Sequence, residues 1–371
     1  MIVKNANVLL EDGAFHICDV RFEREIQALG CFERDEGFNA EGRYLIPGFI
    51  DIHTHGALGC DFSDGDPAAL PKIARHFAAH GVTSFLATTM TLPEEELTKA
   101  AAAVRAFTPD DAMADCAGMH MEGPFLSYEK RGAQCAEYLH VPDVGFFERV
   151  DKASGGRVRL VAVAPETAGA IPFIREVSKR CTVSLGHTAA DYDAAQAGFL
   201  AGATQLTHLY NGMNGLHHRS PGAIGAGMDA GAFAELICDG LHVHPAAVRA
   251  ACRLFPERIV LISDSLRCAG MPDGDYTLGG QPITLRDGRC TLRGSDTLAG
   301  SVITVYDAVK NLVRFGVPLP SAVAAATHRP AEAVGLRDRG VIAPGRRADL
   351  VLLNAALGVE DVYVRGVRLA R

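Results

Sequence analysis

The sequence predicts an α/β fold: a (β/α)8 barrel of the TIM type, with a small β-sandwich domain formed from both chain ends. Three observations lead to this prediction. The central part alternates strand-like apolar runs with amphipathic helical stretches, the pattern of a parallel α/β fold. Both ends show short alternating strands and turn signals without helical periodicity. The length of 371 residues suits a barrel enzyme with small additions.

The two chain ends are predicted to form one domain. The first segment, from Ile2 to about Gly42, alternates apolar and polar residues and contains the turn signal Glu11-Asp12-Gly13. The last segment, after Gly340, returns to this pattern with strands near 348–353 and 362–369. We therefore predict a β-sandwich domain made of residues 1–46 and 337–371, and a (β/α)8 barrel made of residues 47–336.

The barrel strands follow from counting the apolar runs. We predict eight of them, at 48–53, 83–89, 118–122, 157–164, 182–187, 204–208, 234–239 and 258–264. Helices are predicted between them, at 67–80, 93–107, 171–180, 192–201 and 245–254, several with proline in the first turn and glycine near the end. Residues 271–293 read as turns and short strands, and helices at 302–315 and 321–334 complete the barrel. Eight successive β-α units fit a closed barrel better than an open sheet.

Charge and composition exclude several classes of partner. The formal net charge of −8 argues against nucleic acids and anionic membranes, which attract positively charged proteins. An anionic substrate must therefore meet local cations. The N-terminus has no signal-peptide layout, and no apolar run reaches the length of a membrane span. The ten cysteines are scattered without a Cys-x-x-Cys pair, which predicts reduced thiols and a cytoplasmic location.

Polar residues end the predicted strands, and in such barrels those ends face one shared pocket. They are His53 and His55 after the first strand, Glu122, His187 and His208 after the third, fifth and sixth, His242 beyond the seventh, and Asp264 after the eighth. His53 and His55 point the same way because side-chain direction in a strand repeats every second residue. Glu122, His187 and His208 supply the imidazole and carboxylate ligands that suit zinc or iron(II).

Asp264 is placed for general-base work, because it follows the strand Leu261-Ile262-Ser263 and faces the pocket. Simpler interpretations exist for single residues: Asp264 could cap the following turn, and Glu122 could be an ordinary loop carboxylate. Several other histidines are expected to be core or surface residues rather than ligands, namely His76, His80, His140, His217 and His218. Three ligand-type residues at three different strand ends, together with the pair His53 and His55, are unlikely to occur by chance. The sequence therefore predicts a metal site.

With these residues in place, the sequence resembles the amidohydrolase superfamily and, within it, the N-acetylglucosamine-6-phosphate deacetylases. The strings that carry the resemblance are Met121-Glu122-Gly123-Pro124-Phe125, Lys130-Arg131-Gly132-Ala133, Leu185-Gly186-His187-Thr188, Thr207-His208-Leu209-Tyr210-Asn211, Asp239-Gly240-Leu241-His242-Val243 and Ser263-Asp264. The resemblance runs from about Ile46 to the C-terminus. Amidohydrolases with a metal-bridging lysine carry it at the end of strand four, and 158–166 has no lysine.

The resemblance implies hydrolysis of the acetamide of N-acetyl-D-glucosamine 6-phosphate, with one or two divalent ions, zinc or iron(II), per subunit. It implies that Glu122, His187 and His208 hold the main ion, that His53 and His55 hold a second where present, and that Asp264 is catalytic. It further implies a homodimer in which the neighbouring subunit supplies Arg219. The remaining substrate-binding positions are Ala133, Gln134, Asn211, Gly212, His242, Leu298, Ala299 and Gly300.

The chain departs from the family pattern at Gln134, where better-known members have histidine. A glutamine amide can still donate a hydrogen bond to the acetyl carbonyl region, so we interpret it as a variant. Two other functions remain open on the residues alone. One is an amidohydrolase that acts on a cyclic amide or an N-acyl amino acid. Arg219 and Asn211 argue against this function because they suit a phosphate group. The other is a non-catalytic barrel, which should show gaps among the strand-end ligands.

Overall fold

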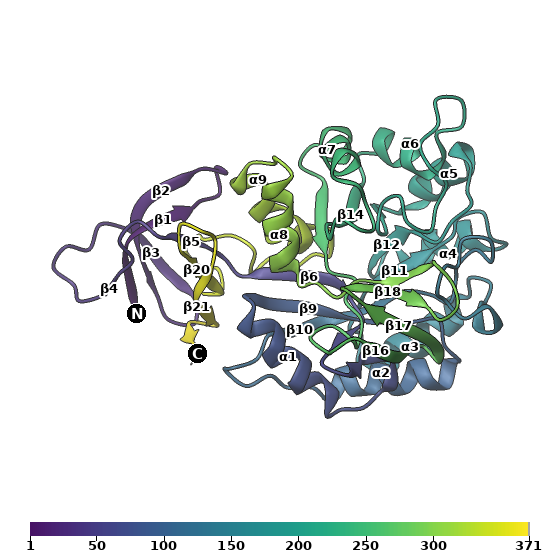
Figure 1. Ribbon diagram of the computed structural model, residues 1–371, viewed down its shortest axis with the longest axis horizontal. Helices are drawn as coiled ribbons and strands as arrows, with labels where there is room; N and C mark the ends of the chain where they lie inside the picture. Colours follow the sequence, from purple (N-terminus) through teal and green to yellow (C-terminus); the bar gives the residue numbers. More distant parts are fainter. Residues whose placement is uncertain (370–371) are drawn as a thin grey trace.

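The computed structural model describes residues 1–369 and contains the predicted barrel (Figure 1). Eight parallel strands pair in chain order. They are β6 (Phe49–Thr54), β9 (Val82–Thr89), β10 (Asp115–Met121), β11 (Val158–Val163), β12 (Thr182–Leu185), β13 (Gln205–Leu206), β14 (Phe233–Ile237) and β15 (Ile259–Ile262). The Asp264 N–H beyond β15 donates to the His53 carbonyl of β6 at 2.9 Å, which brings the last strand back to the first. The predicted fold class is confirmed.

Five of the surrounding helices lie where the apolar periodicity predicts them. They are α1 (Ala69–Ala79), α2 (Glu94–Ala106), α4 (Ala170–Val177), α5 (Tyr192–Ala201) and α7 (Pro245–Leu254). Two helices had not been identified, α3 (Val144–Ser154) and α6 (Gly222–Asp229). The α6 sequence is rich in glycine, a poor helix former, and its first six residues are buried, so tertiary packing and not propensity holds it.

The predicted helix 321–334 is wrong as a single element. The structure has two short helices there, α9 (Leu319–Ala324) and α10 (His328–Ala333). Pro330 explains the break, because its ring would clash with the carbonyl four residues earlier in a continuous helix. The preceding helix, α8 (Val305–Arg314), begins later than predicted, since Thr304 and Asp307 form a capping box that fixes its start.

Both chain ends lie in one small β-domain beside the barrel (Figure 1). Its strands are β1 (Ile2–Leu9), β2 (Phe15–Phe22), β3 (Ile26–Gly30), β4 (Phe38–Asn39), β5 (Tyr44–Pro47), β20 (Leu350–Leu353), β21 (Val359–Val364) and β22 (Val367–Arg368). Strand β5 joins the two ends, because it pairs with β1 on one side and β20 on the other. The β-sandwich domain is thus confirmed, whereas its boundaries at 46/47 and 336/337 stay a prediction, and residues 370–371 lie outside the described residues.

A second, four-stranded antiparallel sheet follows β15. It consists of β16 (Gly274–Leu278), β17 (Gln281–Arg286), β18 (Arg289–Leu292) and β19 (Leu298–Gly300). Smaller elements are β7 (Gly56–Ala57), β8 (Cys60–Asp61) and the 3-10 turns η1 (Phe62–Asp64) and η2 (Ala136–Tyr138). The sheet is tied to the barrel just after β19, where the Ser301 N–H donates to the Asp264 carbonyl at 2.8 Å. None of the helices within residues 1–369 has the length and apolar character needed to cross a bilayer.

Candidate metal centre and its cavity

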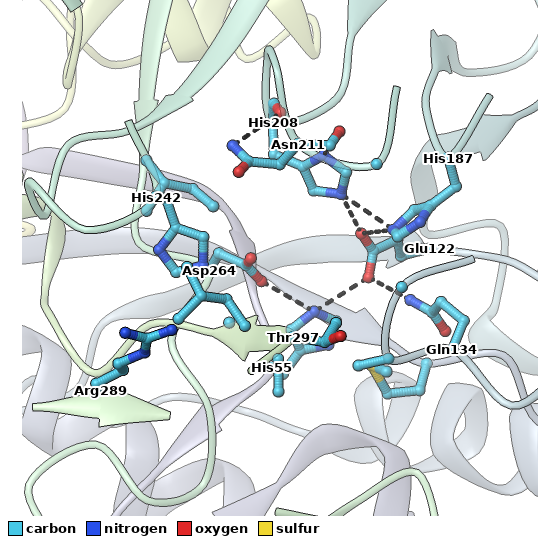
Figure 2. A pocket seen from close by; sticks show the side chains of 18 of the residues that line it. His55, Glu122, Gln134, His187, His208, Asn211, His242, Asp264, Arg289 and Thr297 are labelled. Carbon is cyan, nitrogen blue, oxygen red and sulfur yellow. Dashed lines mark hydrogen bonds and ion pairs between the residues drawn. The ribbon is translucent and has the colours of Figure 1, made fainter. Parts of the chain in front are cut away.

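A cavity of about 350 Å³ opens at the carboxyl ends of the barrel strands (Figure 2). Most of the predicted site residues line it: His55, Glu122, Ala133, Gln134, His187, His208, Asn211, Gly212, His242, Asp264, Leu298, Ala299 and Gly300. His53 is fully buried and does not line the cavity. Arg219 is exposed and is also absent from the wall of this single chain. The polar residues at the predicted strand ends therefore identified most of the cavity wall.

Glu122, His187 and His208 form a compact group whose ligand atoms face one another. The Glu122 Oε1 atom lies 3.1 Å from His187 Nε2 and 3.0 Å from His208 Nε2. The two Nε2 atoms are themselves 3.1 Å apart. All three side chains are buried, with exposed fractions of 3–7%. These residues come from three different strand ends and meet at one point.

The opposite nitrogens of the two imidazoles define their protonation. His187 Nδ1 lies 2.8 Å from the Lys130 carbonyl and His208 Nδ1 lies 3.0 Å from the Asn211 carbonyl. A carbonyl only accepts, so each Nδ1 carries a hydrogen, and Nε2 is the nitrogen whose lone pair can bind an ion. Two lone pairs and a carboxylate oxygen within 3.1 Å repel one another. The donor set therefore fits a divalent cation.

A second group consists of His53, His55 and Asp264, which also face Glu122. His55 Nε2 lies 3.2 Å from Glu122 Oε2 and 3.3 Å from Asp264 Oδ1. His53 Nε2 lies 3.3 Å from Glu122 Oε1 and has no hydrogen-bond partner although it is buried. Glu122 thus lies between the two groups and could contact ions in both.

Glu235, a residue that the sequence did not single out, anchors this second group. Its fully buried carboxylate accepts from His53 Nδ1 at 2.9 Å, from the His208 backbone N–H at 3.2 Å and from Gln205 Nε2 at 2.5 Å. The hydrogen on His53 Nδ1 leaves the Nε2 lone pair directed at the second group. A charged residue within the buried strand Phe233–Ile237 was the signal that could have revealed it.

The electrostatics of the two groups favour positive charge at their centre. Burial opposes charging of His55, but hydrogen bonds to Asp264 and Glu122 outweigh it and raise its pKa to about 9. Burial alone would raise the pKa of Glu122, yet His53 and the other imidazoles hold that pKa well below its usual range. A cation bound there takes the place that protons would otherwise hold.

The backbone holds three of these side chains in an uncommon conformation. His187, His208 and Asp264 have φ angles of 45°, 27° and 49°, in the left-handed region that non-glycine residues rarely adopt. Strain of this kind costs about 1–3 kcal/mol per residue and concentrates at functional sites. Gly212 is required beside them, since a Cβ there would approach His187 Nδ1 to 3.0 Å and His208 Cε1 to 3.3 Å.

Gln134 lies deeper than expected. Its Nε2 donates to Glu122 Oε2 at 2.7 Å (Figure 2), and its Oε1 accepts from the Thr91 N–H at 2.7 Å. The side chain is only 4% exposed. It therefore holds the Glu122 carboxylate in place, and only its remaining amide hydrogen is available to a molecule in the cavity.

The predicted sugar-side residues form the opposite wall. His242 Nδ1 is held by Asp239 at 2.6 Å, which leaves its Nε2 for the cavity. Asn211 donates to the carbonyls of His208 and Leu209 at 3.3 and 3.2 Å. One cation on the wall was not anticipated, Arg289 of β18. The five histidines expected not to bind metal lie in neither metal-binding group of the described residues.

Comparisons with known proteins agree with this geometry. The amidohydrolase family model matches residues 44–369. The chain is 39% identical to an N-acetylglucosamine-6-phosphate deacetylase of Vibrio furnissii over 327 residues, 87% of this chain and 82% of the relative. It is also 39% identical to an N-acetylgalactosamine-6-phosphate deacetylase of Escherichia coli O157:H7 over 331 residues, 88% of each.

Solved structures are similar over the whole chain. A variant of the N-acetyl-D-glucosamine-6-phosphate deacetylase of Mycobacterium smegmatis, in complex with N-acetyl-D-glucosamine-6-phosphate, superposes with a TM-score of 0.92 at 32% identity. The match covers 100% of this chain and 99% of that one. The corresponding enzyme of Thermotoga maritima gives a TM-score of 0.90 at 31% identity and covers 100% of both chains.

Proposed function

The chain belongs to the amidohydrolase family, and we propose that it hydrolyses the acetamide of N-acetyl-D-glucosamine 6-phosphate to D-glucosamine 6-phosphate and acetate. The family match and the curated relatives confirm the resemblance that the strand-end motifs indicated. The observation that carries the proposal is the convergence of Glu122, His187 and His208 beside Asp264 in one cavity. This complete ligand set is the reason to reject a non-catalytic scaffold. The cytoplasmic location stays a prediction.

We assign the main divalent ion, zinc or iron(II), to Glu122, His187 and His208, and a second ion to His53 and His55. Their imidazole and carboxylate ligands are those both metals use in proteins. When bound, such an ion polarises the acetamide carbonyl and lowers the pKa of water. The buried lone pairs on both sides of Glu122 support this assignment.

The chain's own residues move the protons and hold the substrate. Asp264 accepts a proton from the attacking water as oxygen bonds to the carbonyl carbon, and returns it to the departing amine nitrogen as the C–N bond breaks. The free amide hydrogen of Gln134 is the side-chain donor available to the developing oxyanion, and one such donor contributes roughly 3 kcal/mol, whereas His242 lies on the sugar side of the cavity. Asn211, the Gly212 backbone and residues 298–300 orient the sugar.

A second candidate substrate is the galacto epimer, because one relative at 39% identity is named for it. The two candidates share the acetamide and the 6-phosphate and differ only at one ring carbon. The residues that hold the acetamide therefore serve either sugar.

The test is acetate release by purified protein from N-acetylglucosamine 6-phosphate, beside its galacto epimer and unphosphorylated N-acetylglucosamine. We expect turnover of a phosphorylated sugar that stops on chelation and returns with zinc or iron(II), because the ligand set is complete without other cofactors. The ratio of kcat/KM between the epimers decides which sugar is preferred. Absence of acetate from every sugar with both metals would overturn the proposal.

We further propose a homodimer in which Arg219 reaches the neighbouring site. Its exposure and its absence from the wall of the single chain support a role outside its own subunit. Arg219→Ala should raise KM for the phosphorylated sugar far more than for the unphosphorylated one, since it removes a charge that only the phosphate meets.

Subunit mixing tests the arrangement directly. Arg219→Ala and Asp264→Asn subunits, each inactive or impaired alone, should regain about a quarter of wild-type activity after refolding together, because half of randomly paired two-fold dimers are mixed and each has one complete site. No gain on mixing, with dimers present, would place Arg219 elsewhere.

A further inference from the structure

Among the described residues, 1–369, Arg289 is the only lysine or arginine that lines the cavity. The wall also carries the carboxylates of Glu122, Asp264 and Asp296. A phosphate dianion that enters such a cavity needs a cation within reach, and a guanidinium is well suited because it can donate two parallel hydrogen bonds. We propose that Arg289 is a substrate-binding residue that contacts the 6-phosphate within its own subunit, an inference that rests on the proposed function.

The backbone of Arg289 is fixed relative to the proposed catalytic base. Arg289 is the first residue of β18, and the next residue, Cys290, pairs with Gly300 of β19. The residue after Gly300, Ser301, donates its N–H to the Asp264 carbonyl at 2.8 Å. Cys290 is buried, with its Sγ 3.7 Å from that of Cys268. One short strand pair therefore connects Arg289 to Asp264, so the Arg289 backbone is held at a set position beside the cavity.

The side chain itself is free to bind a ligand. Its exposed fraction is 51%, and its polar partner among residues 1–369 is Asp296, whose backbone carbonyl accepts at 3.3 Å. The Asp296 carboxylate lies 4.0 Å away and is fully exposed, and a pair of that kind contributes little because water screens it. A phosphate can therefore replace this partner at little cost.

The position of Arg289 identifies the phosphate as the group it meets. Figure 2 shows Arg289 on the side of the cavity where His242 lies, away from His187 and Gln134. The proposed function places the acetamide carbonyl at the ion held by Glu122, His187 and His208, so the opposite end of the sugar can extend toward Arg289. With Arg219 from the neighbour, Arg289 would hold the phosphate from two subunits.

A matched pair of variants tests the proposal. Arg289→Ala removes the guanidinium. Arg293→Ala removes one that directly follows β18, has a nearly equal exposed fraction of 52%, pairs with Asp275 and does not line the cavity. The measurements are kcat and KM for the phosphorylated substrate, and the inhibition constants of D-glucosamine 6-phosphate and D-glucosamine.

Arg289→Ala should raise KM and the inhibition constant of the phosphorylated product by about 10- to 100-fold, the effect of a lost hydrogen bond to a charged group, with kcat nearly unchanged. The constant for D-glucosamine should not move, Arg289→Lys should restore part of the loss, and Arg293→Ala should match the wild type. Equal losses for both products, or an unchanged KM, would overturn the role of Arg289. Inactivity of the wild type would instead overturn the proposed function.

Discussion

Asp264→Asn is expected to lower kcat by about 10²- to 10⁴-fold, the contribution of a well-placed general base. The carboxylate is 7% exposed, lines the cavity and points at the ligand groups, with Oδ1 3.3 Å from His55 Nε2. Burial would raise its pKa, but the hydrogen bond with His55 and the neighbouring imidazole charges lower it, so the group is ionised and able to take a proton. The amide of asparagine has the same shape and cannot accept that proton.

Metal content must be measured in the same samples, because Asp264 also belongs to the His53 and His55 group. A large fall in kcat with the metal retained supports the base, and loss of an ion would show that Asp264 acts as a ligand instead. Asp296→Asn is the matched control, since it removes another carboxylate from the cavity wall, one that is fully exposed and outside both metal groups. Wild-type turnover by the Asp264→Asn protein would contradict the mechanism.

The location of the site could be predicted from the sequence because it follows from topology. Parallel barrel strands end at one face, so polar residues such as Glu122, His187 and Asp264 had to converge once the eight strands were identified. The apolar pattern that identified the strands is a local property of the sequence, so it can be read without knowing the tertiary structure. The same reasoning places His53 and His55 on one side, and the structure shows both facing Glu122.

The residues that sequence reasoning missed act through contacts that no periodicity encodes. Glu235 looks like a single polar residue in an apolar strand, and its role appears only when the closed barrel brings His53 of β6 within 2.9 Å of its carboxylate on β14. Arg289 belongs to an inserted sheet whose placement depends on the hydrogen bond between Ser301 and Asp264. Gln134 was expected to face the acetyl group, but its position between Glu122 and Thr91 depends on the folded loop.

Glu122→Gln should remove both ions and lower activity by on the order of 10³-fold or more, because a bound Lewis acid contributes several kcal/mol and each 1.36 kcal/mol is a factor of ten in rate. The Glu122 oxygens lie within 3.3 Å of imidazole nitrogens from all four histidines of the two groups. Its replacement leaves those lone pairs without the carboxylate charge that balances a divalent cation.

Glu235→Gln separates the two ions and is the sharper comparison, since Glu235 bonds the side chain of His53 but contacts His208 only at its backbone N–H. An uncharged partner holds His53 less firmly, so affinity at the His53 and His55 position should fall by about 10- to 100-fold while the ion at His187 and His208 stays. Metal-to-protein ratios by mass spectrometry should then read two for the wild type, one for Glu235→Gln and none for Glu122→Gln, with circular dichroism confirming that each is folded. Equal metal-to-protein ratios in the wild type and Glu235→Gln would mean that the ion at His53 and His55 does not depend on Glu235. A ratio of one in the wild type would restrict the chemistry to the ion held by Glu122, His187 and His208.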